Sequence, residues 1–387
     1  ANTDQARLYE MASEVHERVQ VPKPRLMILR PLGNDMKYYG TRLQSSGDLQ
    51  TSAACSLPRG RVAASTLDAL ALLHPEVCAR YFGCAFVVPE KLQACKVLDL
   101  GSGSGRDCYL LSRLVGPSGW VVGLDMTEEL VSAARKYIQY HQEKFGYEKP
   151  NTIFIQGYME RLDESGIRSD FFDVVVSNCV ICLCPDKKAV LEEACRVLKE
   201  GGEFFFSDMY ASKVIPENLK EDPVLWGEGM SGSLYWRDLI ALAQEVGFSV
   251  PRLVTASHII VHSSELLKKT GDITYASSTY RMFKLPKDIV KADAVVTYKG
   301  TVPECSDQLN FDASHTFKTE VPVLVDGETA VILQHSRFTL DFSVQSSDTS
   351  APSQDPSSQY CHLNPFLLAD KLGLSMKQCS KSGNERL

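Results

Sequence analysis

The chain has 387 residues, 44% of them hydrophobic, and a formal net charge of −7. This is enough for one large or two to three ordinary domains with hydrophobic cores, and we expect a cytoplasmic globular protein. No apolar run reaches the roughly 18 residues of a membrane span, no signal-peptide pattern is present, and no basic stripe offers itself to nucleic acid or to a membrane.

The first 92 residues divide into an extension and a lid segment. Residues 1–34 hold a short helical pattern and then Val21-Pro22-Lys23-Pro24, which indicates an extended linker. In residues 35–92, a polar loop with Cys55 precedes helical patterns at 66–73 and 75–82, and Cys84 follows the second pattern. We expect this segment to form a helical lid in front of the next domain.

Residues 93–212 alternate apolar strand patterns with helical patterns. We expect strands at 97–100, 120–125, 152–156, 172–177 and 203–207, and helices at 107–115, 128–145 and 187–199. Such alternation is typical of an α/β fold with a parallel sheet and right-handed crossovers. Functional residues are then expected at the carboxyl ends of the strands.

The most informative motif is the glycine-rich turn Asp99-Leu100-Gly101-Ser102-Gly103-Ser104-Gly105-Arg106-Asp107, directly behind the first strand. A strand, a glycine turn and a helix in this order present bare backbone N–H groups to a nucleotide-like ligand. The spacing Gly-x-Gly-x-Gly differs from the dinucleotide pattern Gly-x-Gly-x-x-Gly. We therefore expect S-adenosylmethionine (SAM) as cofactor, with an NAD-dependent oxidoreductase as the weakest alternative and a plain loop as the structural one.

Residues at the other strand ends complete the expected cofactor site. The carboxylate of Asp125 can accept hydrogen bonds from both ribose hydroxyls or cap the next helix, and Met126 can cover an adenine face. Asp99 can contact the ammonium group indirectly, and Glu160 can reach the adenine edge or act as a helix cap. The expected cofactor residues are Asp99, Gly101, Ser102, Gly103, Gly105, Asp107, Asp125, Met126, Thr127, Gly157, Tyr158, Met159, Glu160, Asn178 and Val180.

After residue 212 the pattern changes. Residues 213–343 combine loops, a helix at 236–246 and short strands such as 252–255 and 294–298, which predicts a smaller C-terminal α+β domain. Residues 344–387 begin with a stretch rich in serine, proline and glutamine and are expected to form a disordered or weakly ordered tail.

Twelve cysteines are many for a cytosolic chain, in which disulfides are rarely structural. Cys179 closes the fourth strand next to the glycine turn, so its thiolate could accept a methyl group, bind a metal or hold a soft substrate atom, unless it is simply buried. Cys182 and Cys184 follow it without a second Cys/His pair, so structural zinc is not expected. Four others are expected to be small buried hydrophobes: Cys78, Cys95, Cys108 and Cys195.

A set of short stretches carries a family resemblance: Tyr38-Tyr39-Gly40, 48–51 leading to Cys55, 81–84, 98–107, 176–179, 225–228 and 234–236. Together they resemble the eukaryotic arsenite methyltransferases over residues 36–343. The glycine motif is common to many methyltransferases, whereas the cysteine contexts are specific to this family.

The resemblance implies a class I SAM-methyltransferase (Rossmann-like) fold and the SAM-dependent methylation of thiol-bound trivalent arsenic. It implies that Cys55, Cys84 and Cys179 are catalytic and bind arsenic, since they match three of the family's four functional cysteines. It also implies resetting by a thiol reductant such as thioredoxin or glutathione, and we expect a monomer without a structural metal.

The sequence departs from the family at Gly229, where the fourth cysteine is expected after Trp226-Gly227-Glu228. Either three thiols suffice, or Cys182 or Cys184 compensates, or these two cysteines only replace other small residues. Two other functions stay open at this point. One is a SAM methyltransferase for another metalloid or an organic molecule, and the other is a thiol-based metalloid-binding protein without turnover.

Overall fold

The computed structural model describes residues 62–349, except 82 and 84, together with 351 and 363–377. The expected N-terminal extension, Cys55 and Cys84 lie outside this part of the chain. Within it, no helix is both long and apolar enough to cross a membrane.

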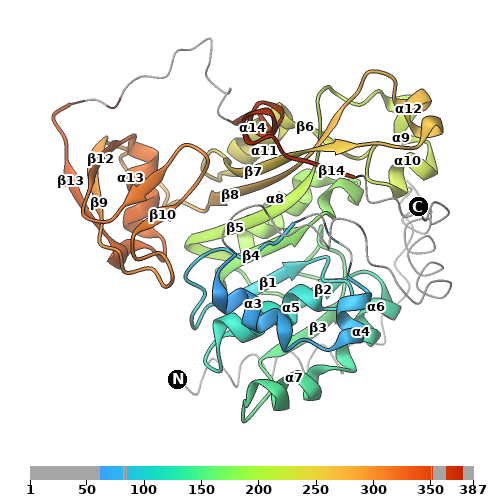
Figure 1. Ribbon diagram of the computed structural model, residues 1–387, viewed down its shortest axis with the longest axis horizontal. Helices are drawn as coiled ribbons and strands as arrows, with labels where there is room; N and C mark the ends of the chain where they lie inside the picture. The colour runs from blue at the N-terminus through green and yellow to red at the C-terminus, as the bar shows by residue number, and fades with distance from the viewer. Residues whose placement is uncertain (1–61, 82, 84, 350, 352–362, 378–387) are drawn as a thin grey trace.

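A nine-stranded sheet forms the centre of the protein, in the order β14-β7-β8-β5-β4-β1-β2-β3, with β6 beside β5 (Figure 1). The strands from β5 to β3 in this order pair in parallel, whereas β8 runs antiparallel to both β5 and β7. The expected α/β fold with a mostly parallel sheet is confirmed. The strands are β1 (Lys96–Leu100), β2 (Trp120–Asp125), β3 (Thr152–Gln156), β4 (Phe172–Asn178), β5 (Leu198–Ala211), β6 (Leu234–Tyr235), β7 (Arg252–Ile260), β8 (Tyr275–Phe283) and β14 (Ser375–Lys377).

Helices cover both faces of this sheet because successive strand residues point to opposite sides. In β1, Val97 belongs to one hydrophobic core, and Leu98 and Leu100 belong to the other. The first core is closed by α3 (Ala64–Ala71), α4 (Pro75–Ala79), α5 (Arg106–Val115), α6 (Glu128–Arg135) and α7 (Ile138–Phe145). The second is closed by α8 (Lys187–Val197), α11 (Trp236–Val246) and α14 (Pro365–Leu372).

A smaller domain with its own core lies beside the sheet (Figure 1). It contains a three-stranded antiparallel sheet, a hairpin and one helix. Its elements are β9 (Ala294–Tyr298), β10 (Gln308–Asn310), β11 (Thr316–Lys318), β12 (Pro322–Val325), α13 (Gly327–His335) and β13 (Phe342–Ser346). The short helices α9 (Glu217–Lys220), α10 (Pro223–Gly227) and α12 (Ser264–Thr270) lie in the connections around β5, β6 and β7.

Residues 213–343, which the sequence groups into one domain, are divided in the structure. β6, β7 and β8 belong to the main sheet, and only the later strands form the small domain. The reason is long-range pairing: β8 aligns with β5 over nine residue pairs, from Tyr275 with Ala211 to Phe283 with Glu203. The expected tail also holds α14 and β14, which return to the main sheet beside β7.

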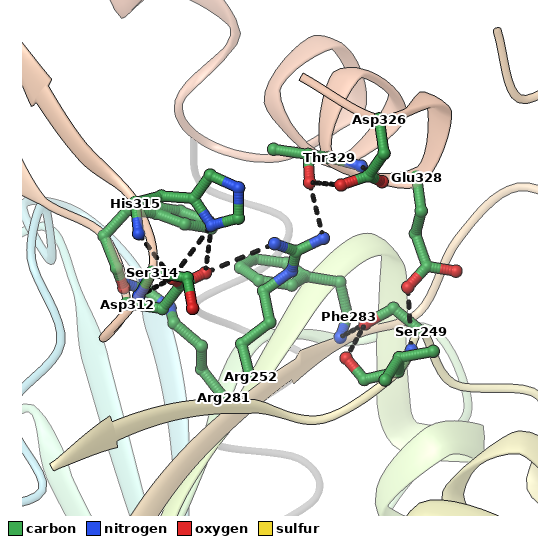
Figure 2. Close-up of polar contacts among 12 residues, drawn as sticks. Ser249, Arg252, Arg281, Phe283, Asp312, Ser314, His315, Asp326, Glu328 and Thr329 are labelled. Carbon is green, nitrogen blue, oxygen red and sulfur yellow. Dashed lines mark hydrogen bonds and ion pairs between the residues drawn. The ribbon is translucent and has the colours of Figure 1, made fainter. Parts of the chain in front are cut away.

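Polar contacts attach the small domain to the main sheet, as Figure 2 shows. Arg252 of β7 lies between two side chains of the small domain: its Nη1 is 3.2 Å from Asp312 Oδ2, and its Nη2 is 2.8 Å from Thr329 Oγ1. Glu328 Oε1 also accepts a hydrogen bond from the backbone N–H of Val250 at 2.8 Å. We call this contact region, together with the neighbouring ion pairs of Arg281, the seam.

Candidate active site

The glycine turn connects β1 to α5 through three glycines with positive φ: +75° at Gly101, +53° at Gly103 and +87° at Gly105. Residues with a Cβ rarely adopt this conformation, so the turn requires glycine. A Cβ on Gly101 would come within 2.7 Å of Val180, and one on Gly105 within 2.8 Å of Phe154. A Cβ on Gly103 would meet nothing within 4 Å. The turn is therefore packed at both ends and open at its centre, where a ligand can approach the backbone.

Asp125, at the carboxyl end of β2, holds the centre of this turn. Its Oδ2 accepts a hydrogen bond from the N–H of Gly103, and its Oδ1 accepts one from the N–H of Thr127, each at 2.9 Å. Burial raises the pKa of Asp125, and these two hydrogen bonds oppose that shift. The Thr127 side chain also bonds to this carboxylate, which still keeps a lone pair for a hydroxyl donor. The geometry thus allows both predicted roles of Asp125: capping the start of α6 and accepting hydrogen bonds from ribose hydroxyls.

Asp99 lies buried in β1 beneath the turn. The Cys108 thiol donates a hydrogen bond to its Oδ2 at 3.2 Å. Burial and the neighbouring carboxylates of Asp107 and Asp125 raise the pKa of Asp99 to about 8. The nearby Ser102 hydroxyl is also buried, without a hydrogen-bond partner in the described part of the chain. A ligand that brings a cation and polar atoms would satisfy these groups, and SAM, with its ammonium, sulfonium and ribose, fits this requirement.

Asn178, the last residue of β4, connects the turn to the lid segment. Its Nδ2 lies within hydrogen-bond distance of Tyr81 Oη (2.7 Å), Ala85 O (2.7 Å) and Asp107 Oδ2 (3.0 Å). The guanidinium of Arg106 pairs with Asp107 at 2.5 Å and stacks 3.9 Å from the centre of the Tyr81 ring. Tyr81 and Arg106 were not predicted as site residues, because an aromatic ring after a helical pattern and a cation at a helix start have many other roles.

The loop after β3 contributes mainly backbone to the site. Gly157 donates its N–H to the Asp125 carbonyl at 3.0 Å, which brings this loop beside β2. Met159 is 7% exposed and packs in the core with Leu162, so its backbone and not its side chain is suited to contact a ligand. Glu160 is partly buried, and burial raises its pKa. Of the residues predicted here, Tyr158 and Glu160 keep partly exposed side chains that can contact a ligand.

Cys179 directly follows β4 and has a φ of +56°. A non-glycine residue in this region costs about 1–3 kcal/mol, and such residues concentrate at functional sites. The Cys179 N–H donates to Ser207 O on β5 at 2.7 Å, and the next residue, Val180, packs against Gly101. The strained backbone therefore holds Cys179 beside the glycine turn.

Two buried side chains lie next to this cysteine. The Sγ atoms of Cys179 and Cys182 and a carboxylate oxygen of Asp208 all lie within 4.8 Å of one another. The N–H of Cys182 donates to Asp208 Oδ2 at 3.2 Å, and the N–H of Met209 donates to Oδ1 at 2.7 Å. Burial raises the pKa of Asp208. Asp208 directly follows the predicted strand 203–207, at an end where functional residues are expected, but its sequence context indicated no specific role.

The comparisons with known proteins agree with this arrangement. Residues 91–247 match the methyltransferase-domain family, and residues 291–385 match the arsenite methyltransferase C-terminal domain. The mouse arsenite methyltransferase is 47% identical over 93% of this chain and 92% of its own length. This chain belongs to the arsenite methyltransferase family.

Other arsenite methyltransferases cover the chain similarly. The human protein is 46% identical over 88% of this chain and 92% of its own. The crystal structure of CrArsM, an arsenic(III) SAM methyltransferase from Chlamydomonas reinhardtii, superposes with a TM-score of 0.71 at 40% identity. It covers 76% of this chain and is itself covered completely. The class I SAM-methyltransferase fold implied by the family resemblance is thereby confirmed.

Proposed function

We propose that this protein transfers methyl groups from SAM to trivalent arsenic held by thiolates, giving methylated arsenicals. One observation carries the proposal: Cys179 lies at the carboxyl end of β4, beside a glycine turn that is open at Gly103. Family membership supports the same reaction, because the mouse and human relatives are named arsenite methyltransferases.

The proposed SAM site follows the elements around the turn. Asp125 receives the ribose hydroxyls, Asp99 faces the ammonium side, and Glu160 and the backbone of Gly157 border the adenine side. The backbone at Gly103 lets the cofactor pass without a steric clash. The other proposed contacts come from Gly101, Ser102, Gly105, Asp107, Met126, Thr127, Tyr158, Met159, Asn178 and Val180.

Thiolates suit the proposed substrate because soft sulfur ligands favour a soft centre such as As(III). We propose that Cys55, Cys84 and Cys179 are the catalytic cysteines and hold arsenic. SAM supplies an electrophilic methyl group, and the arsenic lone pair attacks it in line. The residues contribute by positioning the two reactants and by excluding water, which together lower the barrier.

Methyl transfer formally oxidises arsenic from the trivalent to the pentavalent state. Two cysteine thiols that pass to a disulfide supply the two electrons that return it to the trivalent state. We propose that a cellular thiol such as thioredoxin or glutathione then reduces the disulfide. We further propose that the enzyme acts as a monomer in the cytoplasm, where such thiols are maintained.

The test is to incubate the protein with methyl-labelled SAM, arsenite and glutathione, and to separate mono-, di- and trimethylated arsenic by chromatography. We expect labelled arsenicals from the wild-type protein and none from Cys179→Ser. Cys195→Ser is the matched control, since this partly buried cysteine belongs to α8 and packs against the core. Arsenite binding without any labelled product would instead indicate a metalloid-binding protein without turnover, and antimonite in a parallel reaction tests another metalloid as substrate.

A further inference from the structure

The group formed by Cys179, Cys182 and Asp208 has the composition of a binding site for a soft ion. Within the described part of the chain, it is the one group of three His, Cys, Asp or Glu side chains whose ligand atoms all lie within 4.8 Å. Two of its three donors are sulfur, which favours a thiophilic centre over magnesium or calcium. Cys182 and Asp208 are 3% and 2% exposed, so they form the floor of the site beneath the more exposed Cys179.

Gly229 explains how the sulfur of Cys182 fits into this floor. Gly229 follows α10 and has a φ of +77°, and a Cβ built on it would lie 3.0 Å from Cys182 Sγ. The same Cβ would lie 3.9 Å from the Cys182 Cβ. A side chain on residue 229 would therefore compete with this sulfur for one space. The loop after β4 and the turn after α10 converge on this space, and in this protein residue 182 supplies the sulfur.

Asp208 fixes the orientation of Cys182. Its carboxylate accepts one hydrogen bond from the Cys182 backbone N–H and another from the Cys182 side chain. The other carboxylate oxygen is held by the N–H of Met209. A side chain that is held by hydrogen bonds in this way loses less rotamer freedom when its sulfur binds a ligand. The same contacts leave Asp208 beside the atom that must lose a proton.

Cys184 does not share these properties, although only one residue separates it from Cys182. Its Sγ points back to the Val180 carbonyl at 3.6 Å, and it lies outside the group of ligand atoms. The two cysteines that the sequence could not separate are therefore distinct in the structure.

We propose that Cys182 is an additional arsenic ligand beside Cys179, with Asp208 as its positioning residue. The proposal rests on the proposed function for the identity of the substrate. Each new As–S bond replaces one As–O or As–S bond of the incoming arsenical, and the thiol proton leaves with that ligand as water or thiol. The exchange transfers no electrons.

The experiment measures arsenite binding by the full chain without SAM, by dialysis followed by arsenic quantification, and SAM binding by calorimetry. Loss of a ligand's hydrogen-bond partner typically costs 10- to 100-fold in metal affinity, and loss of the ligand itself should cost at least as much, so we expect Cys182→Ala to weaken arsenite binding by roughly 100-fold. Asp208→Asn should weaken it by about 10-fold. The matched control Cys184→Ala should bind arsenite like the wild type, and all three variants should retain SAM binding.

Arsenic X-ray absorption gives a second readout, because the number of sulfur neighbours should fall by one in Cys182→Ala. The double variant Cys182→Ala/Gly229→Cys returns a thiol to the same space and should restore affinity and sulfur count. Wild-type affinity and an unchanged sulfur count in Cys182→Ala would overturn the inference and leave the proposed function intact. No arsenite binding by the wild type would instead contradict the proposed function itself.

Discussion

Buried carboxyl groups behave in opposite ways at the two ends of this protein. Around the glycine turn and Cys179, burial dominates and raises the pKa of Asp99, Asp125 and Asp208. At the seam, burial is outweighed by other contacts: two arginines lower the pKa of Glu203, and a hydrogen bond from His315 together with Arg252 brings that of Asp312 to about 2. A buried acid is therefore not informative by itself. At the candidate site no cation of the described residues offsets the burial of Asp99 or Asp125, and Lys187 offsets that of Asp208 only in part.

At the seam, arginines neutralise the charge of the buried Glu203. Arg281 is fully buried, its Nε lies 2.5 Å from Glu203 Oε1, and its Nη1 donates to the Phe311 carbonyl at 2.8 Å. Arg337 pairs with the second oxygen of Glu203. These pairs satisfy charge within the protein, whereas Asp99 and Asp125 near the turn have no such pair among the described residues and can meet charge from a ligand.

The largest expected effect comes from breaking the balance at the seam. Arg281→Met leaves Glu203 buried with a single cation, which should lower the free energy of unfolding by about 3–5 kcal/mol. Urea denaturation measures this change. Lys213→Met is the control, because its pair with Asp272 is exposed, and its unfolding midpoint should stay the same. A midpoint for Arg281→Met equal to that of the control would contradict the distinction.

At the turn, Asp99→Asn should have opposite effects on stability and binding. The pKa of Asp99 is about 8 when folded, against a model-compound value of 3.8 for the unfolded chain, so the folded protein retains a proton that the unfolded chain releases. The contribution of Asp99 to the free energy of unfolding is therefore fully present below about pH 4 and is lost as the pH rises toward 8. Without SAM, the variant should lack this fall and melt higher than the wild type near pH 8.

The same variant should bind SAM about 10- to 100-fold more weakly near pH 8, because it cannot supply a negative charge to the ammonium side. Thermal melting at about pH 5 and pH 8, with calorimetric SAM titration, checks both halves of the prediction. Unchanged SAM affinity together with unchanged melting at both pH values would show that Asp99 neither carries an uncompensated buried charge nor contacts SAM.

Asp312 gives the opposite pH dependence. Its folded-state pKa of about 2 lies below the model-compound value of 3.8, so its stabilising contribution is present above pH 3.8 and is lost as the pH falls through 2. Asp312→Asn should therefore lower the free energy of unfolding by about 2 kcal/mol near pH 6. The difference should vanish near pH 2, which urea denaturation at both pH values measures. A difference that is constant with pH would indicate a purely steric effect.

The smallest effect separates backbone strain from ligand contact. Gly103 and Gly146 both have positive φ, and a Cβ on either would meet nothing within 4 Å, but Gly146 ends α7 away from the turn. Replacing either by alanine should cost about 1 kcal/mol of stability. Only Gly103→Ala should also weaken SAM binding, as calorimetry can test. Equal SAM affinity in the two variants would remove Gly103 from the cofactor site.

Much of the central sheet was predictable because its strands are short, apolar and separated by clear turns. The bounds of β2 and β3 agree with the prediction, whereas β5 runs from Leu198 to Ala211 instead of 203–207. Gly201 and Gly202, which follow the expected helix at 187–199, belong to β5, and the Gly201 N–H donates to Lys284 O across the sheet. That partner lies more than 80 residues away, and no local pattern reveals it.

The expected helix at 128–145 is divided into α6 and α7 at Lys136 and Tyr137. The hydroxyl of Tyr137 bonds to Glu76, and its ring lies 4.3 Å from that of His74. The division therefore coincides with contacts to α4 and its cap, which the helical periodicity does not contain. Long-range contacts of this kind limit what periodicity alone can predict.

The glycine turn and Asp125 could be found from the sequence because the residues that make them are neighbours or follow consecutive strands. The distinction between Cys182 and Cys184 could not. It depends on Asp208 from β5 and on Gly229 after α10, and neither is near these cysteines in the sequence. The types of ligand residue could thus be predicted from short stretches of sequence, whereas their orientation depends on contacts formed in the tertiary structure.

The return of the chain to the main sheet has a consequence for how the protein is made. β14 pairs in parallel with β7 only after the whole small domain has been traversed, so that domain is an insertion within the main one. During synthesis, the backbone of β7 remains an unpaired sheet edge until residue 377 has emerged, and exposed edges of this kind favour aggregation. By pairing with β7, β14 therefore protects this edge of the sheet once synthesis has reached it.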